Sequence, residues 1–319
     1  MAETFFTISD GSARAVMGIR RRSDGTVQTL DQAVPDGDTV GAQLDGTGAS
    51  RFLGIDTPEK SFEHPLGAGQ GLDGPQWEQY LTNPFANGYP AHLLEPPLAA
   101  HLQGRFGPGA GANHHRHAVA AGDHLRQMIQ SDQVALGQSP EQFRYFLAFS
   151  YEVFDRFGRF LAFVNRNQPD ATVPAPRPRS YNERQLEAGR ALPYFIWPNV
   201  NPFREFDTIV DAVPLPGTAR TIAERGDLKH AREAVKNARA NGLGVFDPAD
   251  PLRFEAFEVR FLGRGEVPIR AVIDLSRDDT LLLRPQSYFK IPNPEDRLFV
   301  PGEFVPLFAA KGWRLEGFV

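Results

Sequence analysis

The sequence contains no cysteine. Disulfide bonds, thiolate metal sites and cysteine nucleophiles are therefore excluded. The absence says little about the cellular compartment.

Long hydrophobic runs are also missing. No run of about eighteen apolar residues occurs, so no membrane-spanning helix is expected. The start, Met-Ala-Glu-Thr-Phe-Phe, lacks the basic region and apolar segment of a secretory signal, although a removed leader would leave no trace. The 319 residues, 41% hydrophobic and 23% charged, are enough for one elaborated domain or two. We expect a soluble, cytoplasmic protein without membrane contact.

An excess of positive charge is absent as well, since 34 Lys and Arg face 39 Asp and Glu, a net charge of -5. Tight, non-specific binding of DNA usually depends on a basic surface, and this composition argues against it. A local arginine cluster beside a bound cation can still hold a single phosphate.

Acidic residues gather in two neighbouring stretches. Asp36-Gly37-Asp38-Thr39 is typical of a turn that opens a strand, and Arg51 to Ile55 is the expected return strand, which ends at Thr57-Pro58. Asp38 and Asp56 would then lie at the same end of two paired strands. Two acids repel each other there unless a positive group lies between them, and a hard divalent cation with oxygen ligands meets that need. For Asp36 alone, a plain turn-forming role is an equally good interpretation.

A third segment, Asp155-Arg156-Phe157-Gly158-Arg159, is expected to be the turn of a hairpin whose strands are 143–153 and 160–164. Together with DGDT at 36–39 and RFLGIDTPE at 51–59, it resembles the staphylococcal nuclease (thermonuclease) family. The resemblance covers roughly residues 29–250, interrupted by insertions. It implies an α+β fold built on a five-stranded OB-fold barrel with about three helices.

The resemblance also implies roles for the acidic residues. Asp38 and Asp56 would bind Ca²⁺, or Mg²⁺, together with the backbone carbonyl of Thr57. Asp36 would lie next to the direct ligands without contacting the metal itself. Glu59 would orient or deprotonate the attacking water.

The arginines and aromatic residues would contact the substrate. Arg51 and Arg159 would clamp the phosphate, because a planar guanidinium can bond two oxygens at once. Arg156 and Phe157 stand where the family commonly has lysine and tyrosine. Phe195 and Trp197 stand where it has tyrosines that pack on the nucleotide, although core packing is an alternative for Phe195.

The implied activity is cleavage of DNA or RNA to products with 3′-phosphate ends. The alternative is a non-catalytic OB-fold module that binds nucleic acid or a protein partner. One geometric requirement concerns Arg51 and Asp56, which would point to opposite faces of a flat strand. We expect a bend or bulge near Gly54 to correct this.

The remaining segments set the predicted domain boundaries. Residues 1–28 are a β-rich extension, 29–250 the nuclease-like domain, and about 60–112 an irregular, Gly- and Pro-rich insertion after the metal-site hairpin. Residues 251–319 are expected to be a β-rich extension that braces the barrel, since Phe257, Val259 and Phe261 alternate with polar residues.

Three helices are predicted. One follows Asn113-His114-His115-Arg116-His117, which we interpret as a polar helix start rather than a metal cluster, because a hard cation prefers oxygen ligands. The second spans 182–189. The third spans 227–240 and has Leu228, Ala231, Val235 and Ala238 on one face.

Overall fold

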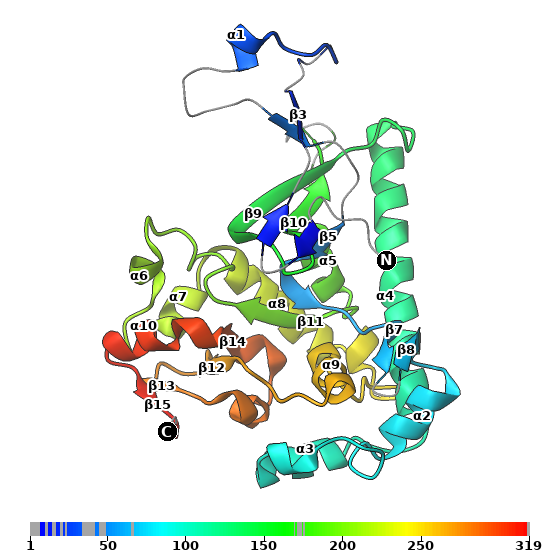
Figure 1. The fold of residues 1–319 in the computed structure, drawn as a ribbon, viewed down its shortest axis with the longest axis vertical. Helices are drawn as coiled ribbons and strands as arrows, with labels where there is room; N and C mark the ends of the chain where they lie inside the picture. Colours follow the sequence, from blue (N-terminus) through cyan, green and yellow to red (C-terminus); the bar gives the residue numbers. More distant parts are fainter. Residues whose placement is uncertain are drawn as a thin grey trace. The chain divides into compact units, whose positions relative to one another are not determined.

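The structure is a computed structural model that describes residues 7–9, 12–14, 17–19, 22, 24–33, 42–44, 49–64, 67–168, 170, 174 and 176–317 (Figure 1). The chain divides into two compact units. Unit 1 is formed by Met1–Arg51 and Phe149–Ala162, and unit 2 by Phe52–Ala148 and Phe163–Val319.

Unit 1 contains short antiparallel strand pairs. β1 (Thr7–Ser9) pairs with β2 (Ser12–Arg14), and β3 (Met17–Ile19) pairs with β4 (Ala42–Leu44). The short helix α1 spans Leu30–Ala33.

A three-stranded sheet has the order β5-β10-β9. The strands are β5 (Ser50–Phe52), β9 (Tyr145–Phe154) and β10 (Phe160–Arg166). The predicted hairpin turn is present, because the Gly158 N–H donates to the Asp155 carbonyl over 2.9 Å. Gly158 has a φ of +76°, which is unfavourable for other residues.

The central sheet of unit 2 has the order β12-β14-β11-β6. Its strands are β6 (Gly54–Asp56), β11 (Leu192–Ile196), β12 (Ala271–Asp274) and β14 (Arg297–Val300). β11 pairs antiparallel with β6 and parallel with β14. The C-terminal segment therefore supplies two of the four strands and is not an appendage to the preceding residues.

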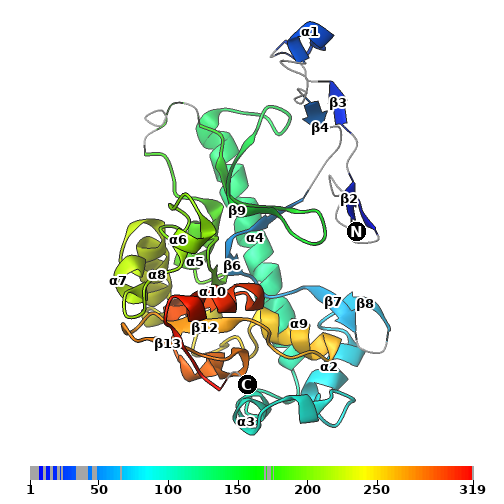
Figure 2. The ribbon, with the colours of Figure 1, turned by 60° about the vertical axis from the view of Figure 1, so that its left-hand side comes forward.

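The segment predicted to be an irregular insertion is folded. It forms a hairpin and two α-helices that bury Trp77, Leu98 and Leu102. Its elements are β7 (Ser61–His64), β8 (Gly67–Gly71), α2 (Pro75–Thr82), η1 (Ala91–Leu93) and α3 (Pro96–Gln103). Figure 2 shows helix α9 (Ala256–Arg264), which packs on β7, near α2.

The three predicted helices are present. The first, α4 (Ala110–Leu136), begins earlier than predicted. The second, α5 (Tyr181–Glu187), is capped by Ser180, whose hydroxyl accepts from the Glu183 N–H. The third, α8 (Gly226–Ala240), buries the four apolar residues of the predicted stripe. The connecting elements are α6 (Ile209–Ala212), α7 (Ala219–Ala223) and η2 (Gly244–Phe246).

The predicted strand through residues 257–261 is wrong, because these residues form α9. Glu255 and Glu258 make a capping box at its start, and Gly265, with a φ of +65°, ends it. The alternation that suggested a strand is misleading because Glu258 is fully buried, where it binds Arg105 over 2.6 Å. The remaining C-terminal elements are β13 (Leu281–Leu282), η3 (Pro285–Lys290), η4 (Pro294–Asp296), η5 (Gly302–Phe304), α10 (Val305–Ala310) and β15 (Arg314–Leu315).

The molecule is thus an α+β protein. Within the described residues its sheets are open, and no closed barrel is present. None of the described helices combines the length and apolar character needed to cross a membrane.

Candidate functional site

The candidate site begins at a break in the strand that carries the RFLGIDTPE motif. β5 ends at Phe52, Leu53 forms a turn, and β6 starts at Gly54 in a different sheet. Gly54 has a φ of +74°, a conformation that glycine adopts without strain. The predicted bend near Gly54 is therefore confirmed.

Asp56 ends β6 and is held by an arginine far away in the sequence. The Arg260 guanidinium on α9 donates from Nη1 to Oδ1 over 3.0 Å and from Nη2 to Oδ2 over 2.6 Å. Asp56 is only 6% exposed. This two-point contact gives the buried carboxylate a cationic partner.

Glu59 converges on the same guanidinium. Its Oε1 accepts from Arg260 Nη1 over 2.8 Å. Burial disfavours the charge on Arg260, but the attraction of Asp56, followed by that of Glu59, outweighs it and raises the arginine pKa above its ordinary value. Arg260 thus supplies a positive centre between Asp56 and Glu59.

His114 on α4 fixes the backbone of Glu59. The Glu59 N–H donates to His114 Nε2 over 2.9 Å, so the imidazole accepts there and carries its proton on Nδ1. Burial lowers the pKa of His114 to about 3, which keeps the ring neutral. The sequence showed the histidine run but gave no reason to connect it with Glu59.

The other helix histidines have separate partners. His117 is buried, and its Nε2 lies 2.9 Å from the Asp250 carbonyl oxygen. Asn113 binds the Asp250 carboxylate over 2.9 Å. The run is part of a helix interface and does not form a metal cluster among the described residues.

A cavity of about 340 Å³ opens beside Thr57 and Glu59. Its wall also includes Lys60, residues of α4, and Gln185 on α5. A ligand therefore has room next to the Glu59 segment.

The predicted phosphate-binding arginines lie in unit 1. Arg51 is half-buried in β5. Arg159 follows the hairpin turn, and its Nε donates to Asp155 Oδ2 over 2.7 Å. The other Asp155 oxygen accepts from the Phe157 and Arg159 N–H groups over 2.9 and 3.0 Å. The turn therefore holds the guanidinium in a fixed position.

Arg156 and Phe157, which the sequence predicts to contact the substrate, are exposed in the same turn. Phe157 is 51% exposed. Arg156 and Arg159 place their guanidinium carbons 4.8 and 5.3 Å from its ring centroid. The turn thus presents an aromatic ring flanked by two cations.

The predicted aromatic contacts at Phe195 and Trp197 are not supported. Trp197 is fully buried against Phe304 and Phe308, and its Nε1 donates to the Ala212 carbonyl over 2.9 Å. Phe195 is 2% exposed, in the same core cluster. Burial closes the Trp197 ring to a base. Phe195 packs in the core, as the alternative for it stated, and part of its ring lines a cavity of unit 2.

The remaining predicted ligands, Asp36 and Asp38, lie outside the described residues. Within the described part, no three His, Asp or Glu side chains come together to hold a metal ion. The two acids that do converge, Asp56 and Glu59, fall short of the six to eight oxygens typical of Ca²⁺.

Comparison with known proteins gives no match to a family model, to a curated protein or to a solved structure.

Proposed function

We propose that the protein is a Ca²⁺-dependent nuclease that hydrolyses DNA or RNA to products with 3′-phosphate ends. The observation that carries the proposal is that Asp56 and Glu59 converge on the guanidinium of Arg260. It occurs at the strand end that carries the nuclease-like motif, beside a cavity lined by Glu59. The OB-fold barrel that the motif implies is part of this proposal.

Glu59 has the position to act on water. Its carboxylate is 28% exposed, and its backbone is fixed by His114. One of its oxygens binds Arg260, and we assign to the carboxylate the role of orienting the water or accepting its proton.

Arg51 and Arg159 would bind the non-bridging phosphate oxygens. The Asp155 contact limits the freedom of the Arg159 side chain, so less conformational entropy is lost when it binds an anion. Loss of one such donor costs on the order of a hundredfold in rate.

A bound Ca²⁺, with Mg²⁺ as the second choice, would neutralise charge on the phosphate. Because the described carboxylates are too few, it would require Asp38 in addition to Asp56 and the Thr57 carbonyl.

A second function, that of a non-catalytic module binding nucleic acid or a protein, is favoured by one observation. Both oxygens of Asp56 are bonded to Arg260, which gives this acid a permanent partner within the protein. In that case, the acids stabilise the fold and no cation is needed.

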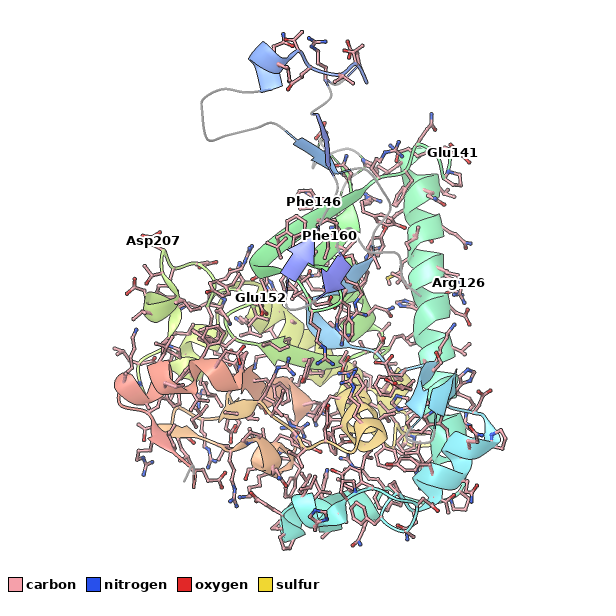
Figure 3. The ribbon with its side chains drawn as sticks, in the orientation of Figure 1. Arg126, Glu141, Phe146, Glu152, Phe160 and Asp207 are labelled. Atoms are coloured by element: carbon pink, nitrogen blue, oxygen red, sulfur yellow. The ribbon has the colours of Figure 1, made fainter. Side chains whose placement is uncertain are left out.

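Cleavage assays separate the two functions. Single-stranded and plasmid DNA are incubated with the protein in Ca²⁺, Mg²⁺ or a chelator. We expect cleavage in Ca²⁺ to 3′-phosphate ends, and a loss on the order of a hundredfold in Glu59→Gln and in Arg159→Ala. Matched controls are Glu233→Gln, on exposed α8 surface, and Arg126→Ala, on the exposed surface of α4 (Figure 3).

Both controls are expected to keep the activity. Cleavage that persists unchanged in Glu59→Gln and Arg159→Ala would exclude this site as its source. Products with 5′-phosphate ends would contradict the proposed chemistry. Absence of cleavage with every cation would favour the binding module.

A further inference from the structure

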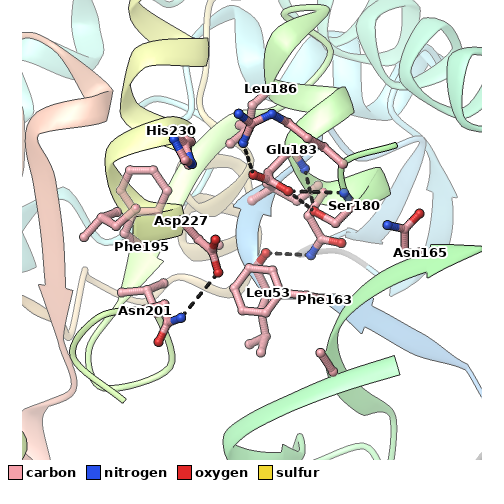
Figure 4. A pocket seen from close by; sticks show the side chains of 18 of the residues that line it. Leu53, Phe163, Asn165, Ser180, Glu183, Leu186, Phe195, Asn201, Asp227 and His230 are labelled. Atoms are coloured by element: carbon pink, nitrogen blue, oxygen red, sulfur yellow. Dashed lines mark hydrogen bonds and ion pairs between the residues drawn. The ribbon is translucent and has the colours of Figure 1, made fainter. Parts of the chain in front are cut away.

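Unit 2 contains a second, larger cavity that the proposed nuclease site does not use. Its volume is about 540 Å³, within the range of small-molecule sites. Figure 4 shows side chains that line it. It is lined by residues of β6, β9, β10, β11, α5 and α8 and of the segments between them. The apolar residues of its wall include Leu53, Ile55, Phe163, Leu186, Phe195 and Leu228.

The walls of this cavity are fixed by interactions within the protein. Asn182, 1% exposed, accepts from the Val164 N–H over 2.9 Å and donates to the Leu53 carbonyl over 2.8 Å. Gly54 leaves space, since a Cβ there would lie 3.6 Å from the Phe163 ring. The interior is thus preformed and suits an apolar group.

The rim of the cavity is polar, and two of its charged residues, Arg179 and Glu183, form an ion pair. Arg179 binds Glu183 over 3.0 Å, and Asp227 accepts a weak hydrogen bond from Asn201 over 3.4 Å (Figure 4). Arg177 differs, because its guanidinium carbon lies 5.3 Å from the centroid of the exposed Phe146 ring. No ion pair among the described residues involves Arg177, so this exposed arginine is available to an anion at the rim.

We propose that this cavity binds a small amphipathic anion. An aromatic or alkyl body fills the interior against Phe163 and Phe195, and the acidic group binds Arg177 at the rim. Burial of the body supplies most of the affinity, and the charge-assisted contact selects anions over neutral molecules of the same shape. This inference is independent of the nuclease proposal.

Two fluorescent probes that differ by one sulfonate group test the proposal. 8-Anilinonaphthalene-1-sulfonate carries a sulfonate, whereas N-phenyl-1-naphthylamine has the same rings without it. We expect one saturable site for the sulfonate probe, and about tenfold weaker binding in Arg177→Gln, while the neutral probe is unaffected. Arg177→Lys should retain part of the preference, and the control Arg126→Gln should change neither probe.

A second variant tests the location. Ala148 is half-buried in β9 and lines the cavity, so Ala148→Trp places a ring inside it. Binding of both probes should then fall at least tenfold. The proposal is overturned if Arg177→Gln affects both probes equally or neither, if Ala148→Trp leaves binding intact, or if the sulfonate probe shows many unsaturable sites.

Discussion

At the scale of single residues, the main feature is one arginine that serves two acids. Arg260 bonds both oxygens of Asp56 and one oxygen of Glu59. A buried ion pair contributes little compared with an apolar pair of the same shape, but removal of one partner leaves an uncompensated charge. The stability of the Asp56–Glu59–Arg260 cluster therefore depends strongly on the charge of Arg260.

Replacement of this residue gives a direct prediction. Arg260→Met should lower the free energy of unfolding by about 3–5 kcal/mol, because Asp56 loses its cation in a buried place. Urea denaturation measures the change. The matched control is Arg126→Met on the surface of α4, which should cost less than about 1 kcal/mol because the Arg126–Asp123 pair is exposed.

The same variant tests whether the acids accept a metal. Millimolar Ca²⁺ should raise the melting temperature of Arg260→Met more than that of the unaltered protein, because the guanidinium no longer competes for Asp56. If Ca²⁺ stabilises neither protein, Asp56 and Glu59 serve only as ion-pair partners of Arg260 in the unaltered protein and bind no cation.

His114 makes the stability of the protein dependent on pH. Its pKa is about 3 in the folded chain and 6.5 when exposed, so between these values the unfolded state binds a proton that the folded state does not. The free energy of unfolding must then fall as the pH decreases from 6.5 towards 3. In His114→Gln the amide oxygen can still accept from Glu59 but does not titrate.

Urea denaturation at pH 7 and pH 5 compares the two proteins. We expect the unaltered protein to lose about 1–2 kcal/mol more than His114→Gln over this interval. Equal losses would show that the imidazole is not held neutral.

At the scale of elements, β14 is the strand that completes the central sheet. It lies between β11 and β12 and buries Leu298 and Val300 completely. A fragment ending at residue 250 would leave the edge of β11 unpaired and its core cluster open. Residues 251–319 are therefore needed for unit 2 to fold.

Both a truncation and a point variant test this requirement. The 1–250 fragment should lack a cooperative thermal transition by circular dichroism. Leu298→Ala should lower the free energy of unfolding by about 2–5 kcal/mol, whereas Leu215→Ala, at a position 62% exposed, should change it by less than about 0.5 kcal/mol. A fragment that melted like the whole chain would restore the predicted boundary at 250.

At the scale of the whole molecule, local signals predicted local structure. The Asp155–Arg159 turn, the bend at Gly54 and the buried stripe of α8 each depend on a few neighbouring residues, and each was predicted correctly. The helices of the insertion were missed, although Pro75 and Pro96 stand at their first positions, where proline is favourable.

Features set by distant residues could not be predicted in this way. Arg260 is separated from Asp56 by 204 positions. The alternation at residues 257–261 is too short to distinguish a strand from a helix. The same limit applies to Trp197, whose burial depends on Phe304 and Phe308. The contact of Arg260 with Asp56 and Glu59 is therefore visible only in the folded chain.

The division of the chain into two units limits how its gene can recombine with other genes. Each unit is assembled from two separate stretches, so the backbone passes between them near residues 51, 148 and 162. A single recombination event cannot transfer either unit intact to another gene. Natural variants that exchange one of them would have to arise by insertion of one coding segment inside another.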